Sequence, residues 1–508
     1  MTLIGLDVGT TGCKAVVFSD GGAVLGSAYR EYGIDADRLG KAEQDAEQVW
    51  QQTRAVLAEA VAKACALRAD AAAVAALSLS VQGDAIIPLD AEGVPVHPAV
   101  LGMDYRCAPQ ADACGRQFGA EALFERTGMR PHPINALCKV LWLREQRPEA
   151  WARTRRITTY ADFILGRLGA PGCIDLTMAS RTMAWDLDRD AWAADLLADL
   201  RLSPDLLSRP VPTGSVVGRL DPALSQALGL HGTVQLVAGA HDQPAGAVGA
   251  GVLEDGDAIV ATGTAEVLAT TFGRRAAGLY AGFYPCYRSA LPDRYFTFTL
   301  NHVGGLMLRW YRDLWGLAEV QEAARRGCDP YEVILSDLPK GPSPVMVLPH
   351  LNGSGTPSCD AGSMGAVVGL TLATTRPEIV KAIIECQCYE LALNLEALTA
   401  AGIAVRNLTA IGGGAKSGEW LQTKADVLNV PIRTLDVAEA GCLGAAIFAG
   451  TGAGMYASIA EGARRVVRFK AGCVPDAEAH AAYLRRFALY RELHGALRPL
   501  HHRLRHAE

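Results

Sequence analysis

Hydrophobic and polar residues follow two different periods along the chain. Short apolar runs with β-like character, such as 77–80 and 234–237, are separated by Ala-rich stretches. Stretches 43–64, 306–314 and 380–398 carry apolar residues at the three- and four-residue spacing of a helix with one buried face. Because strands that alternate with helices are typical of layered proteins, this pattern predicts an α/β fold.

Glycine gathers in three separate places, 238–263, 352–369 and 412–418, where it makes the backbone permissive. A chain of 508 residues is too long for one ordinary core, so we expect two large domains. The predicted boundary lies at 245/246, which gives domains 1–245 and 246–508 with a hinge near 245–255. A helical tail is expected at the end of the second domain.

Composition excludes several classes of function. The net charge is −6, with both signs interspersed, so the chain offers no basic stripe for nucleic acid or an anionic membrane. The apolar runs are short or interrupted by charges, and the chain enters a strand at once instead of a signal segment. We therefore expect no membrane contact and a cytoplasmic protein.

Cysteine and histidine give no metal-binding pattern. The 13 cysteines are scattered without a CxxC pair, and we interpret them as reduced thiols. Cys13 is either a small packing residue or, if exposed, a site sensitive to oxidation. His501, His502 and His506 belong to a polar tail, so we expect them to be solvated.

Residues 7–14 have the layout of a phosphate-binding hairpin. Two glycines between two short apolar runs let the backbone approach a ligand, and Thr10, Thr11 and Lys14 supply hydroxyl, amide and cationic groups. Asp7 cannot face phosphate without a cation between them, which favours Mg²⁺ with a nucleotide. The alternative is an ordinary glycine hairpin.

A second hairpin, at 258–268, repeats this layout with Thr262, Gly263 and Thr264 at its turn. Each half of the chain is thus expected to begin with its own phosphate loop.

Asp242 lies between an apolar strand and a helix of small residues. At the helix N-cap its side chain would accept helix amides, and the helix dipole would favour its ionised form. An ionised carboxylate can take the proton of a hydroxyl nucleophile. The alternative is that Asp242 only caps the helix.

Several motifs occur in an order that resembles the FGGY carbohydrate kinases, which are two-lobed, RNase-H-like ATPases of the actin and hexokinase type. The resemblance runs from Gly5 to about Gly450. The motifs that carry it are 7–14, 79–82, 104–106, 139–149, Asp175 with 179–183, the Asp242 segment, 262–264, 353–370 and 412–417.

The resemblance implies ATP-dependent phosphorylation of a sugar hydroxyl in a cleft between two RNase-H-like domains, the first binding the sugar and the second the nucleotide. Asp242 matches the catalytic base, and Asp7 is expected to hold Mg²⁺. Residues expected to bind ATP are Thr10, Thr11, Lys14, Thr262, Gly263, Thr264, Gly413, Gly414 and Ser417. Residues expected to bind the sugar are Gln82, Asp84, Asp104, Asp242 and Gln243.

Departures from the family pattern bear on the substrate. Where glycerol kinases carry larger groups, this chain has Gly83, Gly102 and Ile134, which favours a substrate larger than glycerol unless another loop refills the space. We therefore expect a ketopentose such as xylulose. The alternatives are a tetritol, glycerol-type or deoxysugar kinase, or a non-catalytic actin-like sensor of sugar or nucleotide. The resemblance is also compatible with a homodimer.

Overall fold

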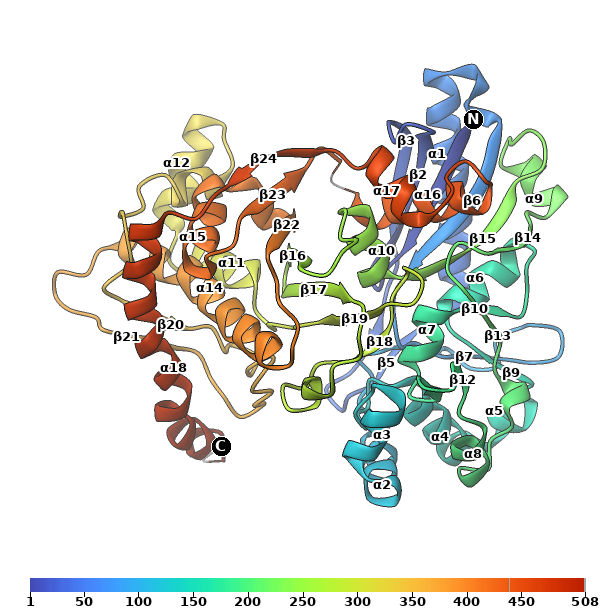
Figure 1. Cartoon of the computed structure of the whole chain (residues 1–508), viewed down its shortest axis with the longest axis horizontal. Coiled ribbons are helices and arrows are strands. Elements are labelled where there is room, and N and C mark those ends of the chain that lie inside the picture. Colours follow the sequence, from blue (N-terminus) through green and yellow to red (C-terminus); the bar gives the residue numbers. More distant parts are fainter. Residues whose placement is uncertain (438, 507–508) are drawn as a thin grey trace.

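The protein consists of two sheet-centred parts that lie side by side, as the computed structural model shows (Figure 1). The structure describes residues 1–437 and 439–506. Each part is a mixed α/β unit built around one sheet, as the alternating pattern predicts. The predicted boundary at 245/246 stays a prediction.

The first sheet has six strands, in the order β14-β15-β6-β1-β2-β3. Their bounds are β14 (Val216–Arg219), β15 (Gln235–His241), β6 (Val74–Val81), β1 (Thr2–Val8), β2 (Gly12–Ser19) and β3 (Val24–Glu31). The central strands β15, β6 and β1 are parallel, so their carboxyl ends meet at one edge. Ligands of open α/β sheets bind at such edges, and Asp7, Gln82 and Asp242 all lie here.

Ten helices and two 3₁₀ turns accompany the first sheet. They are α1 (Ala46–Leu67), α2 (Ala108–Phe118), α3 (Ala120–Thr127), α4 (Ala136–Gln146), α5 (Pro148–Arg153), α6 (Tyr160–Leu168), α7 (Leu176–Arg181), α8 (Ala194–Asp199), α9 (Pro222–Ala227), α10 (Asp242–Gly249), η1 (Ala69–Ala72) and η2 (Pro204–Leu206). Helix α1 begins later than predicted, because Glu43 pairs in a short strand and Asp45 caps the helix.

Short strands complete this part of the chain. They are β4 (Asp35–Ala36), β5 (Ala42–Gln44), β7 (Ile87–Leu89), β8 (Ala99–Val100), β9 (Arg156–Thr158), β10 (Cys173–Asp175), β11 (Trp185–Asp186), β12 (Ala191–Trp192) and β13 (Arg209–Val211).

The second sheet has seven strands, in the order β18-β19-β17-β16-β22-β23-β24. Their bounds are β18 (Tyr287–Arg288), β19 (Tyr295–Phe298), β17 (Glu266–Phe272), β16 (Asp257–Thr262), β22 (Asn407–Gly412), β23 (Ile432–Leu435) and β24 (Phe469–Cys473), and a separate pair is β20 (Met346–Leu348) with β21 (Ala366–Val368). Strands β16 and β17 form the second predicted hairpin.

The remaining helices alternate with strands in the second half of the chain, and α18 follows the last strand. They are α11 (Gly305–Leu314), α12 (Leu317–Arg326), α13 (Pro330–Ile334), α14 (Arg376–Ala400), α15 (Gly418–Leu428), α16 (Ala440–Gly452), α17 (Ile459–Val466) and α18 (Ala477–His506), with η3 (Ala277–Tyr280) and η4 (Gly413–Lys416). The predicted helices at 306–314 and 380–398 lie within α11 and α14.

Helix α16 packs on the first sheet although in sequence it lies between β23 and β24 of the second sheet (Figure 1). It contacts β1, β6 and β15 and also lies against α10. A Cβ added at Gly444 would lie 2.0 Å from the carbonyl oxygen of Ala245, so only glycine permits this close helix contact. The N-terminus of α16 is thereby placed next to Asp7, where an added Gly441 Cβ would be 3.3 Å from Oδ1.

The histidines of the tail are not all solvated, contrary to our expectation. Helix α18 lies along the second part, and His501 is 5% exposed, with its Nδ1 accepting the backbone N–H of Met364. His502 pairs with Asp360 at 2.8 Å. Burial tends to raise the pKa of Asp360, but its bonds to His502 and His494 lower that pKa to about 2. The side chain of His506 lies outside the described residues.

All 13 cysteines are free thiols. Cys13 is fully buried, and burial raises its pKa to about 11, so it is a packing residue and not an exposed, reactive thiol. Within the described part of the chain, every helix is too short or too polar to span a bilayer.

Candidate active site

The first hairpin joins β1 to β2 and carries Asp7 opposite Lys14. Its turn is closed by the Gly9 N–H, which donates to the carbonyl oxygen of Gly12 at 2.9 Å. The Ser80 hydroxyl donates to Asp7 Oδ1 at 2.6 Å. Burial, together with the negative charge of Asp242, raises the pKa of Asp7 to about 6 despite this bond. The carboxylate therefore lies in a place that needs a cation.

The ammonium group of Lys14 is already paired with a carboxylate. Its Nζ is 2.8 Å from Glu439 Oε2, directly before α16, and lies 5.6 Å from the centre of the Tyr29 ring. At the turn, Thr10 is half-buried and Thr11 is exposed. A ligand at this hairpin would thus meet the threonines directly and would compete with Glu439 for Lys14.

Asp242 is the first residue of α10, one position later than the N-cap that we predicted. The cap position belongs to His241, whose side chain makes no capping bond. His241 Nε2 instead lies 3.0 Å from Asp242 Oδ1. The Asp242 side chain is 37% exposed, and Gln243, which follows it, is half-buried. The carboxylate is therefore accessible at the edge where the parallel strands end.

Gln82 stabilises the first hairpin through hydrogen bonds. Its Nε2 donates to the Gly9 carbonyl oxygen at 3.2 Å and to Gln44 Oε1 at 3.3 Å. Gln44 in turn donates to the carbonyl oxygen of Thr10 at 2.9 Å. Gln82 is 3% exposed, so its amide protons are already used by the protein, and a direct contact with a sugar would fall to its carbonyl oxygen.

Asp84 and Asp104 are both buried and paired with arginines. Asp84 accepts from Arg181 Nε at 3.2 Å and also from its Nη2. Asp104 Oδ2 accepts from the Ala42 amide at 2.8 Å and from Arg106 Nη2 at 2.6 Å. Their charges are therefore balanced inside the protein.

The space beside Gly83 is not open, although small residues predicted a roomier pocket. A Cβ at Gly83 would lie 2.6 Å from His241 Nε2 and 3.3 Å from Arg181 Nε. These two side chains occupy the volume that a larger residue would take. At this position the pocket has been refilled from other elements.

The second hairpin borders a cavity of about 650 Å³ in the second part of the molecule. This volume suits a ligand the size of a nucleotide. The cavity is lined by all six residues predicted to bind the nucleotide in this half, Thr262, Gly263, Thr264, Gly413, Gly414 and Ser417. The hydroxyl of Ser417 also accepts the Trp420 amide at 3.2 Å and so caps α15. The sequence motifs thus meet around one cavity.

A buried ion pair lies beneath this hairpin. Lys424 and Glu266 are 1% and 0% exposed and contact each other. Thr262 Oγ1 lies 2.7 Å from both Lys424 Nζ and Glu266 Oε1. The pair therefore fixes the residue from which the turn begins.

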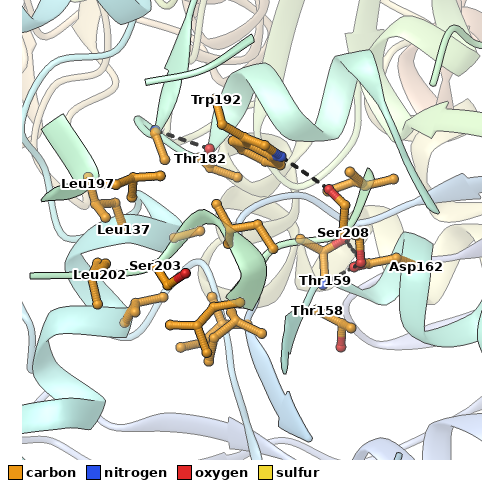
Figure 2. A pocket seen from close by; sticks show the side chains of 18 residues that line it. Leu137, Thr158, Thr159, Asp162, Thr182, Trp192, Leu197, Leu202, Ser203 and Ser208 are labelled. Carbon is orange, nitrogen blue, oxygen red and sulfur yellow. Dashed lines mark hydrogen bonds between the residues drawn. The ribbon is translucent and has the colours of Figure 1, made fainter. Parts of the chain in front are cut away.

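A third space, inside the first part, is too small for a substrate (Figure 2). Its volume is about 30 Å³, enough for a water molecule or two. Leu137, Leu197 and Leu202 line it on one side, and Asp162 lies on the other. The Asp162 carboxylate already accepts bonds from Thr159 and Ser208, so the space carries no chemistry.

Sequence reasoning missed several residues at these sites. Arg181 lies in a motif that we singled out, and His241 directly precedes Asp242, so both had a local signal. Tyr287, 3.0 Å from His241 Nδ1, and Glu439, beside Lys14, had none, because folding alone brings them there.

Comparisons with known proteins agree with this geometry. The model of the FGGY family of carbohydrate kinases, N-terminal domain, matches residues 2–249, and the model of the C-terminal domain matches residues 259–453. A xylulose kinase of Bacillus subtilis is 27% identical over 492 residues, 97% of this chain and 96% of that protein. A gluconokinase of the same organism is 27% identical over 462 residues, 90% of this chain and 87% of its own length.

The solved structure of a "xyloylose kinase" from Brucella ovis is similar over 98% of this chain and 100% of its own, with a TM-score of 0.87 and 26% identity. Relatives with different sugar names thus match about equally well, which shows a sugar kinase without fixing its sugar. Both family models together cover most of the sequence, and the match to the solved structure confirms the predicted two-domain fold of the actin and hexokinase type. The chain belongs to the FGGY family of carbohydrate kinases.

Proposed function

We propose that the protein is a cytoplasmic kinase that transfers the γ-phosphoryl group of ATP to a hydroxyl of a neutral ketopentose such as xylulose. The observation that supports this most is the accessible carboxylate of Asp242 at the edge of the first sheet, with Asp7 close enough for their charges to interact. Asp242 accepts the proton of the attacking hydroxyl, whose oxygen bonds to phosphorus as ADP leaves.

Mg²⁺ fits the donor set at Asp7. This ion prefers one or two carboxylates together with phosphate oxygens and water. Asp7 offers one carboxylate in negative surroundings, with Ser80 holding its Oδ1. When bound, the ion would neutralise charge on the transferring phosphoryl group. The residues of this chain orient the ATP, through the two hairpins, and the sugar, through the residues near Asp242.

A neutral sugar is favoured over an acidic one by the charges near Asp84 and Asp104. Arg181 is paired with Asp84, and Arg106 is paired with both Asp104 and Glu43. A carboxylate on the substrate would gain no cation from these pairs and would face the acidic groups. A gluconate-type substrate would therefore bind less well than a ketopentose.

The test is ADP release with Mg-ATP across ketopentoses, tetritols, glycerol, deoxysugars and gluconate, with phosphorylated products identified by mass. We expect the highest kcat/KM for one ketopentose and the lowest for gluconate. A highest value for gluconate would contradict the substrate class. ATP binding without turnover on any sugar would favour a sensor. The homodimer stays an expectation from the resemblance.

A further inference from the structure

His241 is tied to its surroundings at three points. Its backbone N–H donates to Thr177 Oγ1 at 2.7 Å, its Nδ1 lies 3.0 Å from the Tyr287 hydroxyl, and its Nε2 lies 3.0 Å from Asp242 Oδ1. The side chain is only 5% exposed. Tyr287 comes from β18, the edge strand of the second sheet, so the contact joins the two parts of the molecule.

The chemistry of Asp242, His241 and Tyr287 determines where the protons lie in these two side-chain contacts. An unprotonated Nε2 would place its lone pair 3.0 Å from a carboxylate oxygen, so Nε2 carries the proton. In a neutral imidazole Nδ1 is then an acceptor, and Tyr287 must donate to it. Burial raises the pKa of Tyr287 well above its usual range, so the hydroxyl keeps its proton.

The two carboxylate oxygens of Asp242 have different surroundings. Oδ1 is buried and has no well-aligned hydrogen-bond donor among the described residues, but His241 Nε2 lies 3.0 Å from it, at ion-pair distance. The side chain is nevertheless 37% exposed, so its exposed surface belongs to other atoms, including Oδ2. One oxygen is held inside while the other remains free for a ligand.

Charged groups from several elements face the same carboxylate. Burial tends to raise the pKa of Asp242, but His241, the Arg181 guanidinium on α7 and the Gln243 amide together lower it. Asp7 on β1 acts in the opposite direction through its charge, and Arg181 is itself paired with Asp84. The base therefore stays ionised at neutral pH.

We propose that His241 and Tyr287 are positioning residues that hold Asp242 Oδ1, so that Oδ2 faces the attacking hydroxyl of the sugar. The proposal rests on the proposed function, in which Asp242 is the base. Gly83 belongs to the same arrangement, since a Cβ there would lie 2.6 Å from His241 Nε2 and would displace the imidazole.

The test compares two substitutions of His241, one that keeps a side-chain N–H donor and one that removes it. In His241→Gln the side-chain amide can replace Nε2–H, whereas His241→Phe keeps a ring and removes the donor. We expect His241→Phe to lower kcat about 100-fold, the usual cost of a misplaced catalytic group, with little change in KM for ATP. We expect His241→Gln to restore kcat to within a few-fold of wild type.

The pH profile separates positioning from a loss of structure. Since His241 helps to lower the pKa of Asp242 through its charge and its N–H, the acid limb of kcat/KM for the sugar should move to higher pH in His241→Phe and return in part in His241→Gln, which restores only the N–H. ADP binding, measured by calorimetry, should stay unchanged in both variants, because the nucleotide cavity lies in the other part.

Tyr287→Phe removes a single hydroxyl and still tests the positioning role if His241→Phe does not fold. We expect a roughly fivefold loss of kcat with unchanged ADP binding, since one hydrogen bond to the imidazole is worth about 1 kcal/mol. Wild-type kcat and pH profiles in Tyr287→Phe and in folded His241→Phe would overturn the proposal. Asp242→Asn is run beside them: if it keeps wild-type turnover, the assignment of the base fails, which is a separate result.

Discussion

The two hairpins share a turn built on Gly-Thr and differ in where their charges lie. Two residues before that pair stands Asp7 in the first hairpin and Ala261 in the second. The cross-strand partners are Asp7 with Lys14 and Ala261 with Val267. The second hairpin instead has its charges beneath the turn, where Glu266 and Lys424 are fully buried. In the proposed function, charge thus serves chemistry in the first hairpin, whereas the buried pair of the second hairpin serves its architecture.

The largest effect is expected in the second hairpin. Lys424→Met leaves Glu266 buried without a charged partner, and we expect a loss of about 3–5 kcal/mol in the free energy of unfolding. Combining it with Glu266→Gln should recover much of this loss, because no buried charge then remains unpaired. Urea unfolding of the two single variants and the double variant measures it. A Lys424→Met variant as stable as wild type would show that the pair has no architectural role.

In the first hairpin the effect should fall on activity. Asp7→Asn removes the carboxylate expected to hold Mg²⁺, and we expect kcat to fall about 100-fold or more, as for other lost groups that stabilise transition-state charge. Steady-state kinetics at saturating Mg-ATP measures this. A loss of less than about tenfold would place the metal elsewhere.

The same variant should gain stability in a pH-dependent way. Folding raises the pKa of Asp7 from 3.8 to about 6. Between these two pH values the folded protein therefore keeps a proton on Asp7 that the unfolded chain has released. Stability from this group is complete below about pH 4 and is lost as the pH rises to about 6. Without metal, Asp7→Asn should thus have a higher Tm than wild type at pH 7.5 and an equal Tm at pH 4.

The smallest effect is expected for Lys14. Its pair with Glu439 is partly exposed, so Lys14→Met should change the free energy of unfolding by no more than about 1 kcal/mol. KM for Mg-ATP should rise a few-fold, because a cation near the phosphates is lost. Glu439→Gln is the matched control and should lower KM slightly, since it releases Lys14. Equal changes in both variants would mean that Lys14 acts only through the ion pair.

The features that could be predicted from the sequence are those that depend on neighbouring residues. Both hairpins, the helix after Asp242 and the Gly-rich loop at 412–418 carry their own turn or periodicity signals, and all appear in the structure. The six predicted residues also line the cavity, because each motif marks a place where the backbone can approach a ligand closely.

Contacts between distant segments left no such signal. Helix α16 lies more than 400 residues from β1 in sequence, yet packs on it. Lys424 looks like a solvent-facing lysine in a helix until Glu266, from another element, is placed beside it. Tyr287 reaches His241 only because the edge of the second sheet meets the first part. These residues are set by the tertiary fold, which periodicity does not describe.

The central claim is that Asp242 takes the proton of the sugar hydroxyl, and Asp242→Asn tests it most directly. Asparagine keeps the size of the side chain and removes the basic oxygen. The measurement is kcat for the best sugar substrate with Mg-ATP, together with ADP affinity by calorimetry. The account predicts a loss of about 100-fold or more, at the lower end of what a general base contributes, with ADP affinity unchanged. Turnover within a few-fold of wild type would contradict it.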